Sequence, residues 1–334
     1  MVDGFPAFQP HRLLRNNHLQ TLAGTMFQSR RIPYRAVPHR IHLPDGDMTI
    51  LHDDRPAGWQ PTSPTTLLIH GLAGCHRSSY MVLAAKRLNE AGVRTFRMDM
   101  RACGAAEGLA RMPYHGGCTH DLFVALERVA KICPASPMSL VGYSIGGNVT
   151  LKLAAEAADY LPRQLSRMVV ISPPIDLEVC VDRLSQGAGY IYDRYLGITH
   201  CRQLRRSLAL VEHAPRIVDA LRPRGQRDFD DRYTSTVWGF GSVKQFYTET
   251  SSCHTISDVR IPTLLIASRD DPLVPVELFE PLKSQNSITI HLTDHGGHLG
   301  FIGRSRPDPD RRWLDWRIVD AVTAGRTSSA AEVA

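Results

Sequence analysis

The chain has 334 residues, 43% of them hydrophobic and 22% charged, and this balance excludes a disordered or low-complexity chain. The length suits one large domain with an insertion or two smaller domains. The formal charge is +6, but the arginine-rich stretches 202–227 and 304–317 carry no nucleic-acid-binding motif, so we expect a solvated basic face, no nucleic-acid partner, and at most weak attraction for anionic substrates or a membrane surface.

The first 45 residues are rich in proline, histidine and arginine. We expect residues 1–45 to form an arm that packs around the core. The runs 37–43 and 47–52 are separated by the turn signal Pro-Asp-Gly-Asp. This spacing predicts an antiparallel hairpin at the edge of a sheet.

Six short apolar runs follow along the chain, as expected for parallel strands that are buried on both faces. Helical patterns lie between them at 79–91, 119–132 and 146–160, and each ends close to a glycine or a proline. Alternating strands and helices predict an α/β fold with a mostly parallel, doubly wound sheet. The predicted strands are 65–70, 93–98, 138–143, 168–172, 262–267 and 288–292.

The alternation stops after residue 172 and resumes at residue 262. The segment 173–252 has tyrosines, arginines and a helical pattern but no strand alternation, and we interpret it as a helical lid inserted into the core. Ligands bind at the carboxyl ends of the strands in open α/β sheets, so a lid there would cover the site. The core is then expected at 46–172 and 253–325, with 326–334 as a frayed tail.

The sequence GYSIGG at 142–147 contains the pattern G-x-S-x-G directly after a predicted strand and before a predicted helix. This context is typical of the nucleophile elbow of α/β hydrolases and predicts Ser144 as the nucleophile. Gly142 and Gly146 are expected to give the tight turn the space it needs. The alternative is a glycine-rich helix start with Ser144 as its N-cap.

An earlier predicted strand ends in HGLAG at 70–74, where hydrolases with this elbow supply a backbone N–H to the oxyanion. We expect the oxyanion donors to be the backbone N–H groups of Leu72 and Ile145. His70 and Gly71 are expected to hold the loop in shape. The alternative is an ordinary strand-to-loop turn.

The acid follows the strand at 262–267, because the order of the triad in this fold is Ser, Asp or Glu, and then His. Asp270 and Asp271 stand side by side there. The stretch PTLLIASRDDPLVP fits the common hydrolase pattern P-x-L-x-x-x-G-x-x-D-x-x-V-P, which selects Asp271 and places Ser268 at the usual glycine. Asp270 is the alternative acid, or a side chain that caps a helix or binds a backbone N–H.

The base is expected on the glycine-rich loop after the last strand, in the sequence DHGGHLGF at 294–301. Both His295 and His298 could reach the serine, and we favour His298 because two glycines before it allow close approach of the backbone. A Ser-Asp-His triad hydrolyses an acyl substrate through an acyl-enzyme, and this chemistry requires no metal or organic cofactor.

With these residues, the sequence resembles the YheT-like branch of the α/β hydrolases, which includes the ABHD1/ABHD3-type and EMB8-like proteins. The resemblance implies an esterase- or lipase-like hydrolase, with acyl lipids as the substrate class of its eukaryotic members, and supports the α/β-hydrolase fold. The likeness is carried by NHLQT at 17–21, HGLAG at 70–74, GYSIGGNVTLK at 142–152, FDDRYT at 229–234, GF at 239–240, DDP at 270–272 and GGHLGF at 296–301.

The sequence departs from this branch at 99–104, where DMRACG replaces the usual N-x-R-G-x-G. We expect this change to leave the triad intact and to alter the pocket wall. An acyltransferase or thioesterase would use the same triad, and a non-catalytic binding protein could share the fold. Dehalogenases and epoxide hydrolases fit less well, since they place an aspartate where Ser144 stands.

Neither a signal-like N-terminus nor an apolar run of about 20 residues is visible, and we therefore expect a cytoplasmic protein. The oligomeric state is left open. The seven cysteines are irregularly spaced and include no C-x-x-C, which favours reduced thiols over a disulfide framework or a zinc site. They are Cys75, Cys103, Cys118, Cys133, Cys180, Cys201 and Cys253.

Overall fold

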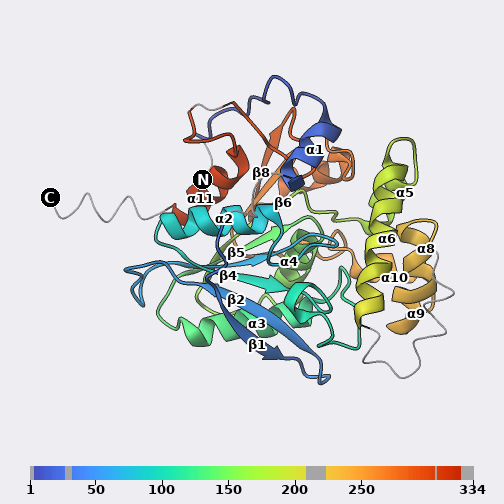
Figure 1. Cartoon of the computed structure of the whole chain (residues 1–334), viewed down its shortest axis with the longest axis horizontal. Helices are drawn as coiled ribbons and strands as arrows, with labels where there is room; N and C mark the ends of the chain where they lie inside the picture. Colours follow the sequence, from blue (N-terminus) through green and yellow to red (C-terminus); the bar gives the residue numbers. More distant parts are fainter. Residues whose placement is uncertain (1–3, 27–31, 208–222, 305–306, 325–334) are drawn as a thin grey trace.

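The computed structural model describes residues 4–26, 32–207, 223–304 and 307–324, and its centre is one eight-stranded sheet (Figure 1). The strand order is β1-β2-β4-β3-β5-β6-β7-β8. The first two strands run antiparallel to their neighbours, and the pairings from β4 to β8 are parallel. The predicted tail at 326–334 lies outside the described residues.

All six predicted parallel strands are present, and the hairpin lies at the sheet edge as expected. Strands β3, β4, β5 and β7 are buried at every position, which explains why they appear in the sequence as short continuous apolar runs. The strands are β1 (Val37–His42), β2 (Met48–Asp54), β3 (Thr65–Ile69), β4 (Arg94–Asp99), β5 (Met138–Tyr143), β6 (Leu165–Ile171), β7 (Thr263–Ser268) and β8 (Ile288–Thr293).

Helices cover both faces of the sheet, so that each face has its own hydrophobic core. Helices α2 (Ser79–Glu90) and α11 (Trp313–Thr323) pack on one face. Helices α3 (Thr119–Ile132) and α4 (Ile145–Glu156) pack on the other. This arrangement is the predicted doubly wound α/β architecture.

The described part of the segment 173–252 is helical and contains no strand. Its elements group together at one side of the sheet, on the right in Figure 1. They are α5 (Leu177–Leu184), α6 (Gly189–Ser207), α8 (Gln226–Phe229), a π-helical turn (Asp230–Thr234), α9 (Ser235–Val237) and α10 (Val243–Thr250).

The N-terminal segment contributes helix α1 (Asn17–Met26), and strand β1 begins within the range expected for the arm. Every cysteine is among the described residues, and none of the seven forms a disulfide. Within the described ranges, no helix combines the length and the hydropathy that crossing a membrane requires.

Candidate active site

Ser144 stands on a strained turn between β5 and α4. Its φ of +51° and ψ of −121° lie outside the regions that residues with a side chain normally adopt. A Cβ at position 142 would lie 2.6 Å from the carbonyl oxygen of Gly146, and one at position 146 would lie 2.1 Å from Ile69. Only glycine fits at both positions, as the sequence predicts. The hydroxyl of Ser144 makes no N-cap hydrogen bond.

The hydroxyl of Ser144 is instead in a chain of hydrogen bonds with His298 and Asp271. Ser144 Oγ lies 2.8 Å from Nε2 of His298, and Nδ1 of the same ring lies 2.8 Å from Oδ2 of Asp271. Both partners are buried. Because a carboxylate only accepts, the imidazole donates from Nδ1 and its Nε2 is free to accept the serine proton.

Strand register explains why side chains so far apart in sequence meet here. Ile69 of β3 pairs with Gly142 of β5, so the two strands end at the same level and the HGLAG loop lies beside the elbow. Ser268 of β7 likewise pairs with Thr293 of β8. The loops carrying the acid and the base therefore start side by side.

The alternative acid and base also form a pair, but it does not include the serine. His295 Nδ1 lies 3.2 Å from Oδ2 of Asp270, and the His295 side chain is about half exposed. Asp270 Oδ1 accepts a hydrogen bond of 2.9 Å from the backbone N–H of Gly297. Binding of a backbone N–H is the role expected of Asp270 if Asp271 is the acid.

The N-terminal helix supports the loop that carries His298, a contact that the NHLQT motif at 17–21 does not by itself reveal. The hydroxyl of Thr21 accepts a hydrogen bond from the backbone N–H of His298 and donates to the carbonyl of Asn17. A Cβ at Gly297 would lie 2.4 Å from the same carbonyl oxygen. Glycine at this position therefore lets α1 (Asn17–Met26) approach the loop closely.

In the HGLAG loop, the backbone N–H of Leu72 lies between two backbone N–H groups that are already hydrogen-bonded. The backbone N–H of Gly71 donates to the Tyr80 hydroxyl at 2.9 Å, and that of Ala73 donates to the Tyr114 hydroxyl at 2.7 Å. The N–H of Leu72 between them has no hydrogen-bond acceptor among the described residues. Two tyrosines that sequence reasoning missed thus fix this loop.

His70, the first residue of the HGLAG sequence, is fully buried. Its Nδ1 bonds to the carbonyl of Gly71, and its Nε2 accepts the backbone N–H of Met100. Burial lowers the pKa of His70, so the ring stays neutral and can make both bonds at once. These contacts support the interpretation that His70 holds the loop in shape.

A cavity of about 530 Å³ opens at Ser144 and His298 and runs between the core and the lid helices. Leu72 and Ile145 line it on the core side. Ala102, from the stretch DMRACG at 99–104, also lines it. Most of the lid side is apolar and includes Leu177, Val181, Leu184, Ile191, Leu196, Leu204 and Phe229.

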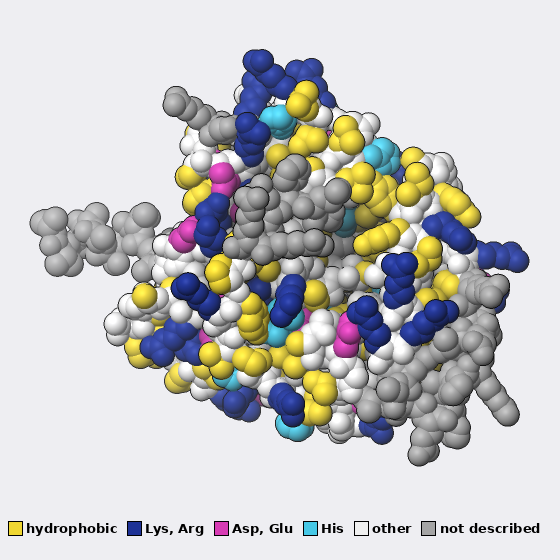
Figure 2. Space-filling model, viewed as in Figure 1, with side chains coloured by type: hydrophobic (Ala, Val, Ile, Leu, Met, Phe, Trp, Pro, Cys, Tyr) yellow, Lys and Arg dark blue, Asp and Glu magenta, His cyan; other side chains and the backbone are white. Residues whose placement is uncertain are grey.

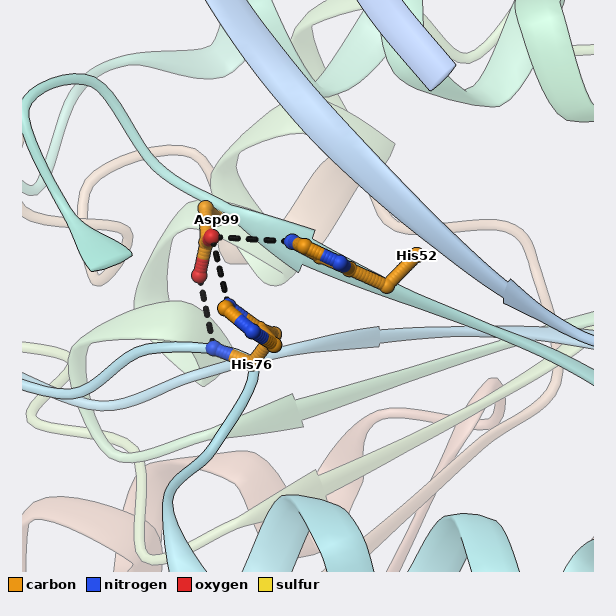
Figure 3. Close-up of side chains that lie close together, drawn as sticks. All are labelled: His52, His76 and Asp99. Atoms are coloured by element: carbon orange, nitrogen blue, oxygen red, sulfur yellow. Dashed lines mark hydrogen bonds and ion pairs between the residues drawn. The ribbon is translucent and has the colours of Figure 1, made fainter. Parts of the chain in front are cut away.

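A second cluster of titratable side chains lies beneath the HGLAG loop and consists of His52, His76 and Asp99 (Figure 3). Both imidazoles donate to Oδ2 of Asp99, at 3.0 Å from His52 and 2.7 Å from His76. The two rings are stacked with centroids 3.6 Å apart and planes 15° apart. The lone pair with which an imidazole nitrogen binds a metal lies in the plane of its ring. Because the two rings are stacked and nearly parallel, a single ion cannot lie in both planes close to both nitrogens. The cluster therefore does not fit a metal site.

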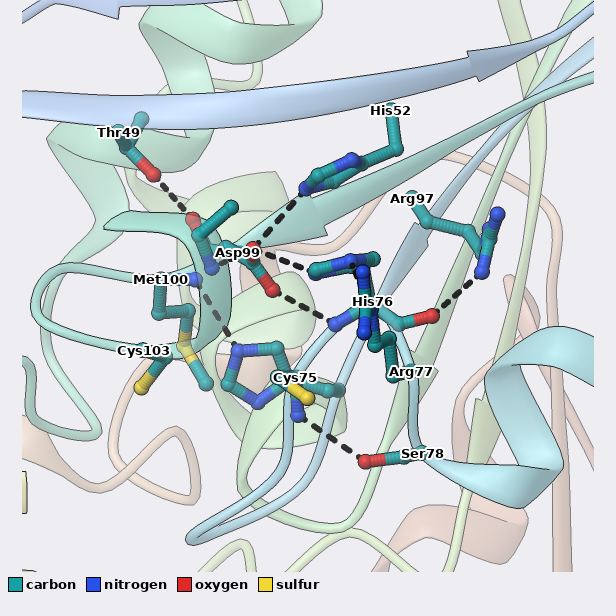
Figure 4. A network of polar contacts seen from close by, with 12 residues as sticks. Thr49, His52, Cys75, His76, Arg77, Ser78, Arg97, Asp99, Met100 and Cys103 are labelled. Atoms are coloured by element: carbon teal, nitrogen blue, oxygen red, sulfur yellow. Dashed lines mark hydrogen bonds and ion pairs between the residues drawn. The ribbon is translucent and has the colours of Figure 1, made fainter. Parts of the chain in front are cut away.

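The remaining contacts show that this cluster is a satisfied hydrogen-bond network (Figure 4). Asp99 also accepts the backbone N–H groups of His76 and Ala105, and the Tyr34 hydroxyl bonds to His52. Burial alone would raise the pKa of Asp99, but hydrogen bonds from the two histidines outweigh it and lower the pKa. The anionic carboxylate therefore ties the loop at 70–78 to the loop after β4 (Arg94–Asp99).

Comparison with known proteins agrees with this architecture. A family model described as alpha/beta hydrolase fold matches residues 64–305. The putative esterase YheT of Escherichia coli (strain K12) is 32% identical over 323 residues, which cover 95% of this chain and 93% of that protein. Human phospholipase ABHD3 is 26% identical over 245 residues, which cover 72% of this chain and 59% of that protein.

Two solved structures share the fold. The 2,6-dihydroxy-pseudo-oxynicotine hydrolase has a TM-score of 0.58 at 16% identity, covering 92% of this chain and 72% of that one. The Pyrococcus furiosus esterase Pf2001 has a TM-score of 0.55 at 15% identity, covering 95% of this chain and 97% of that one. The family model and the extended similarity to YheT place the chain in the α/β-hydrolase family, in its YheT-like branch.

Proposed function

We propose that this protein is a serine hydrolase that cleaves carboxylic acyl esters with Ser144 as nucleophile, His298 as base and Asp271 as acid. The observation that carries the proposal is the unbroken hydrogen-bond chain from the serine to the carboxylate at the mouth of an apolar cavity. Relatives named as an esterase, a monoacylglycerol lipase and a phospholipase support the same reaction class.

The steps follow from the positions of the side chains. His298 accepts the proton of Ser144 through Nε2 as the serine oxygen attacks the acyl carbon, and Asp271 stabilises the resulting imidazolium. The N–H groups of Leu72 and Ile145 stabilise the oxyanion of the tetrahedral intermediate. His298 then protonates the leaving alcohol, and water attacks the acyl-enzyme with His298 again as base.

The cavity supports substrates with an apolar acyl group. Its lid side is formed mainly by aliphatic and aromatic side chains, and burial of one CH₂ group contributes about 0.8 kcal/mol. Turnover of p-nitrophenyl esters should therefore rise with acyl length until the cavity is filled. A thioesterase or acyltransferase would use the same triad, and adding an alcohol acceptor during turnover distinguishes acyl transfer from hydrolysis.

Labelling with a fluorophosphonate tests the nucleophile directly. The wild-type protein should be labelled, and Ser144→Ala should abolish both labelling and ester turnover while the fold is retained. A folded wild-type protein that is neither labelled nor active would instead indicate a non-catalytic binding protein. A cytoplasmic location stays a prediction from the sequence.

We also propose that the rim of the cavity contacts anionic lipid surfaces. Leu19 and Leu22 of α1 are both about half exposed, and Ile191 and Tyr195 of α6 are 73% and 62% exposed. Three of these four, all but Leu19, also line the cavity. Figure 2 shows hydrophobic and basic side chains together over this part of the surface. The apolar rim is thus continuous with the entrance to the site.

Charge favours an anionic surface over a neutral one. Arg194, Arg202 and Arg205 are exposed on α6, whose single acidic residue, Asp193, is buried. We expect binding to vesicles that contain phosphatidylglycerol and little binding to pure phosphatidylcholine.

The double variant Ile191→Ser/Tyr195→Ser should reduce cosedimentation with anionic vesicles severalfold. Tyr160→Ser is the matched control and should bind as wild type does. It removes a similarly exposed aromatic side chain from the surface of the α/β domain, outside the lid. Equal binding by both variants would contradict this part of the proposal.

A further inference from the structure

The amide of Ala73, next to the proposed oxyanion donor Leu72, is the end of a chain of hydrogen bonds that leads into the lid. Its acceptor, the Tyr114 hydroxyl, lies 3.1 Å from Nε2 of His200 on α6 (Gly189–Ser207). Nδ1 of His200 lies 2.9 Å from Oε1 of Gln226. The amide nitrogen of Gln226 in turn donates to the carboxyl group of Asp230 at 2.9 Å.

Asp230 fixes the end of this chain. It lies in the π-helical turn and also accepts hydrogen bonds from the hydroxyls of Thr234 and Tyr247. Burial raises the pKa of Asp230 to about 6, so at pH 8 it is a carboxylate that only accepts. Its partner on Gln226 must then be the NH₂ group, which turns the amide oxygen toward His200.

The direction of every other bond follows from that orientation. The oxygen of Gln226 can only accept, so His200 carries its proton on Nδ1. Burial lowers the pKa of His200 to about 4, which leaves the ring neutral and Nε2 unprotonated. Nε2 therefore accepts the Tyr114 hydroxyl proton, and the tyrosine oxygen accepts the N–H of Ala73. All four bonds donate toward Asp230.

The chain joins two parts of the molecule. Tyr114 belongs to the loop before α3, whereas His200, Gln226 and Asp230 belong to the lid. All four side chains are at least nine-tenths buried and line the cavity. The phenyl ring of Phe229 stacks on the His200 ring at 5.1 Å between centroids, which further fixes the orientation of the imidazole.

We propose that Tyr114, His200, Gln226 and Asp230 are positioning residues that hold the Leu72 N–H toward the oxyanion, so that the oxyanion site is complete only when the lid is seated. This inference rests on the proposed hydrolase function. Ala73 has a φ of +58°, which is unfavourable for a residue with a Cβ, so the loop needs an external hold. Before Leu72, the N–H of Gly71 is bonded to Tyr80 of the core. After Leu72, the N–H of Ala73 is bonded to Tyr114, whose hydroxyl is in turn bonded to His200 of the lid.

Tyr114→Phe tests the end of the chain nearest the site. It removes the acceptor of the Ala73 amide, and displacement of the Leu72 donor should lower kcat for a soluble p-nitrophenyl ester by about 10- to 100-fold. KM should change less than about threefold, because the acyl cavity keeps its shape. Tyr160→Phe also loses one tyrosine hydroxyl, at a site outside the cavity, and should match wild type.

His200 offers a test that a purely structural role would not pass. His200→Gln keeps the pattern, since its oxygen accepts from Tyr114 and its NH₂ group donates to Gln226, and it should retain most of kcat. His200→Leu has a similar volume but no polar atoms and should lose about as much kcat as Tyr114→Phe. The double variant Tyr114→Phe/His200→Leu should lose little more, because both substitutions break one chain.

The outcomes separate this inference from the proposed function. An active wild-type enzyme whose Tyr114→Phe and His200→Leu variants keep a wild-type kcat overturns the positioning role alone. Equal losses in His200→Gln and His200→Leu also overturn it. A folded wild-type protein that is neither labelled by fluorophosphonate nor active overturns both. If Tyr114→Phe does not fold, the two His200 variants in the lid decide the question.

Discussion

Two Asp–His pairs lie next to each other at the carboxyl end of the sheet, and they differ in burial and in what the histidine contacts. Asp271 and His298 form the inner pair, in which both side chains are at least nine-tenths buried and the imidazole reaches Ser144. Asp270 and His295 form the outer pair, in which the histidine is 51% exposed. The residue types are identical, so position alone separates the two pairs.

The contacts of the two carboxylates explain the difference. Oδ1 of Asp271 accepts the backbone N–H groups of Leu273 and Val274, which leaves Oδ2 to face His298. Asp270 instead uses one oxygen to hold the backbone of Gly297, between the two histidines. These contacts support the proposal that the inner pair transfers the proton and that the outer pair holds the loop.

The largest expected loss of activity comes from removing the histidine of the inner pair. His298→Ala should lower kcat/KM for ester hydrolysis by at least about 10³-fold, because it removes the imidazole nitrogen that is hydrogen-bonded to Ser144 Oγ. His295→Ala, the matched change in the outer pair, should cost less than about tenfold. Steady-state kinetics on a p-nitrophenyl ester measures both, and the reverse order would exchange the two roles.

The two aspartates give the next largest effect. Asp271→Asn keeps the shape of the side chain but can present an NH₂ group to His298, which favours the wrong tautomer, and kcat should fall by about 10²- to 10⁴-fold. Asp270→Asn should cost less than about tenfold, since its oxygen can still accept the N–H of Gly297. Similar losses in the two variants would mean that both carboxylates act on the base.

The inner residues were predictable because each lies in a short local pattern. GYSIGG at 142–147 and GGHLGF at 296–301 follow directly after strands, and the level ends of parallel strands bring such loops together. The alternating pattern also predicted the fold. These inferences need only the neighbours of each residue along the chain.

The supports of the site were not predictable in the same way. Thr21, Tyr80 and Tyr114 each accept a backbone N–H from a loop that lies 277, 9 and 41 residues away, respectively. Thr21 belongs to the NHLQT motif, but no local pattern assigns any of the three to this contact. The pairing of His52 with His76 beneath Asp99 likewise depends on how β2, β4 and the loop after β3 pack. Such contacts follow from tertiary packing, and the hydrogen bonds of the lid belong to the same class.

The smallest expected effect, on stability, comes from a hydrogen bond to the loop after β8, which carries the histidines of both pairs. The Ser268 hydroxyl is buried and donates to the carbonyl of Gly297 at 2.9 Å, from the position where the hydrolase pattern usually has glycine. Ser268→Ala should lower the free energy of unfolding by about 1 kcal/mol and Tm by about 1–2 °C. Activity should change less than about threefold, because the inner pair keeps its own bonds.

Thermal unfolding checks this expectation against Ser284→Ala, which should leave Tm unchanged. The Ser284 hydroxyl is exposed, and its one hydrogen bond to a described residue goes to the carbonyl of Pro281. If Ser268→Ala lost activity as strongly as Asp271→Asn while remaining folded, the shared loop would be positioning His298 itself. The inner pair could then no longer be called catalytic and the outer pair merely supporting, because the hydrogen bonds to Gly297 would themselves be required for activity.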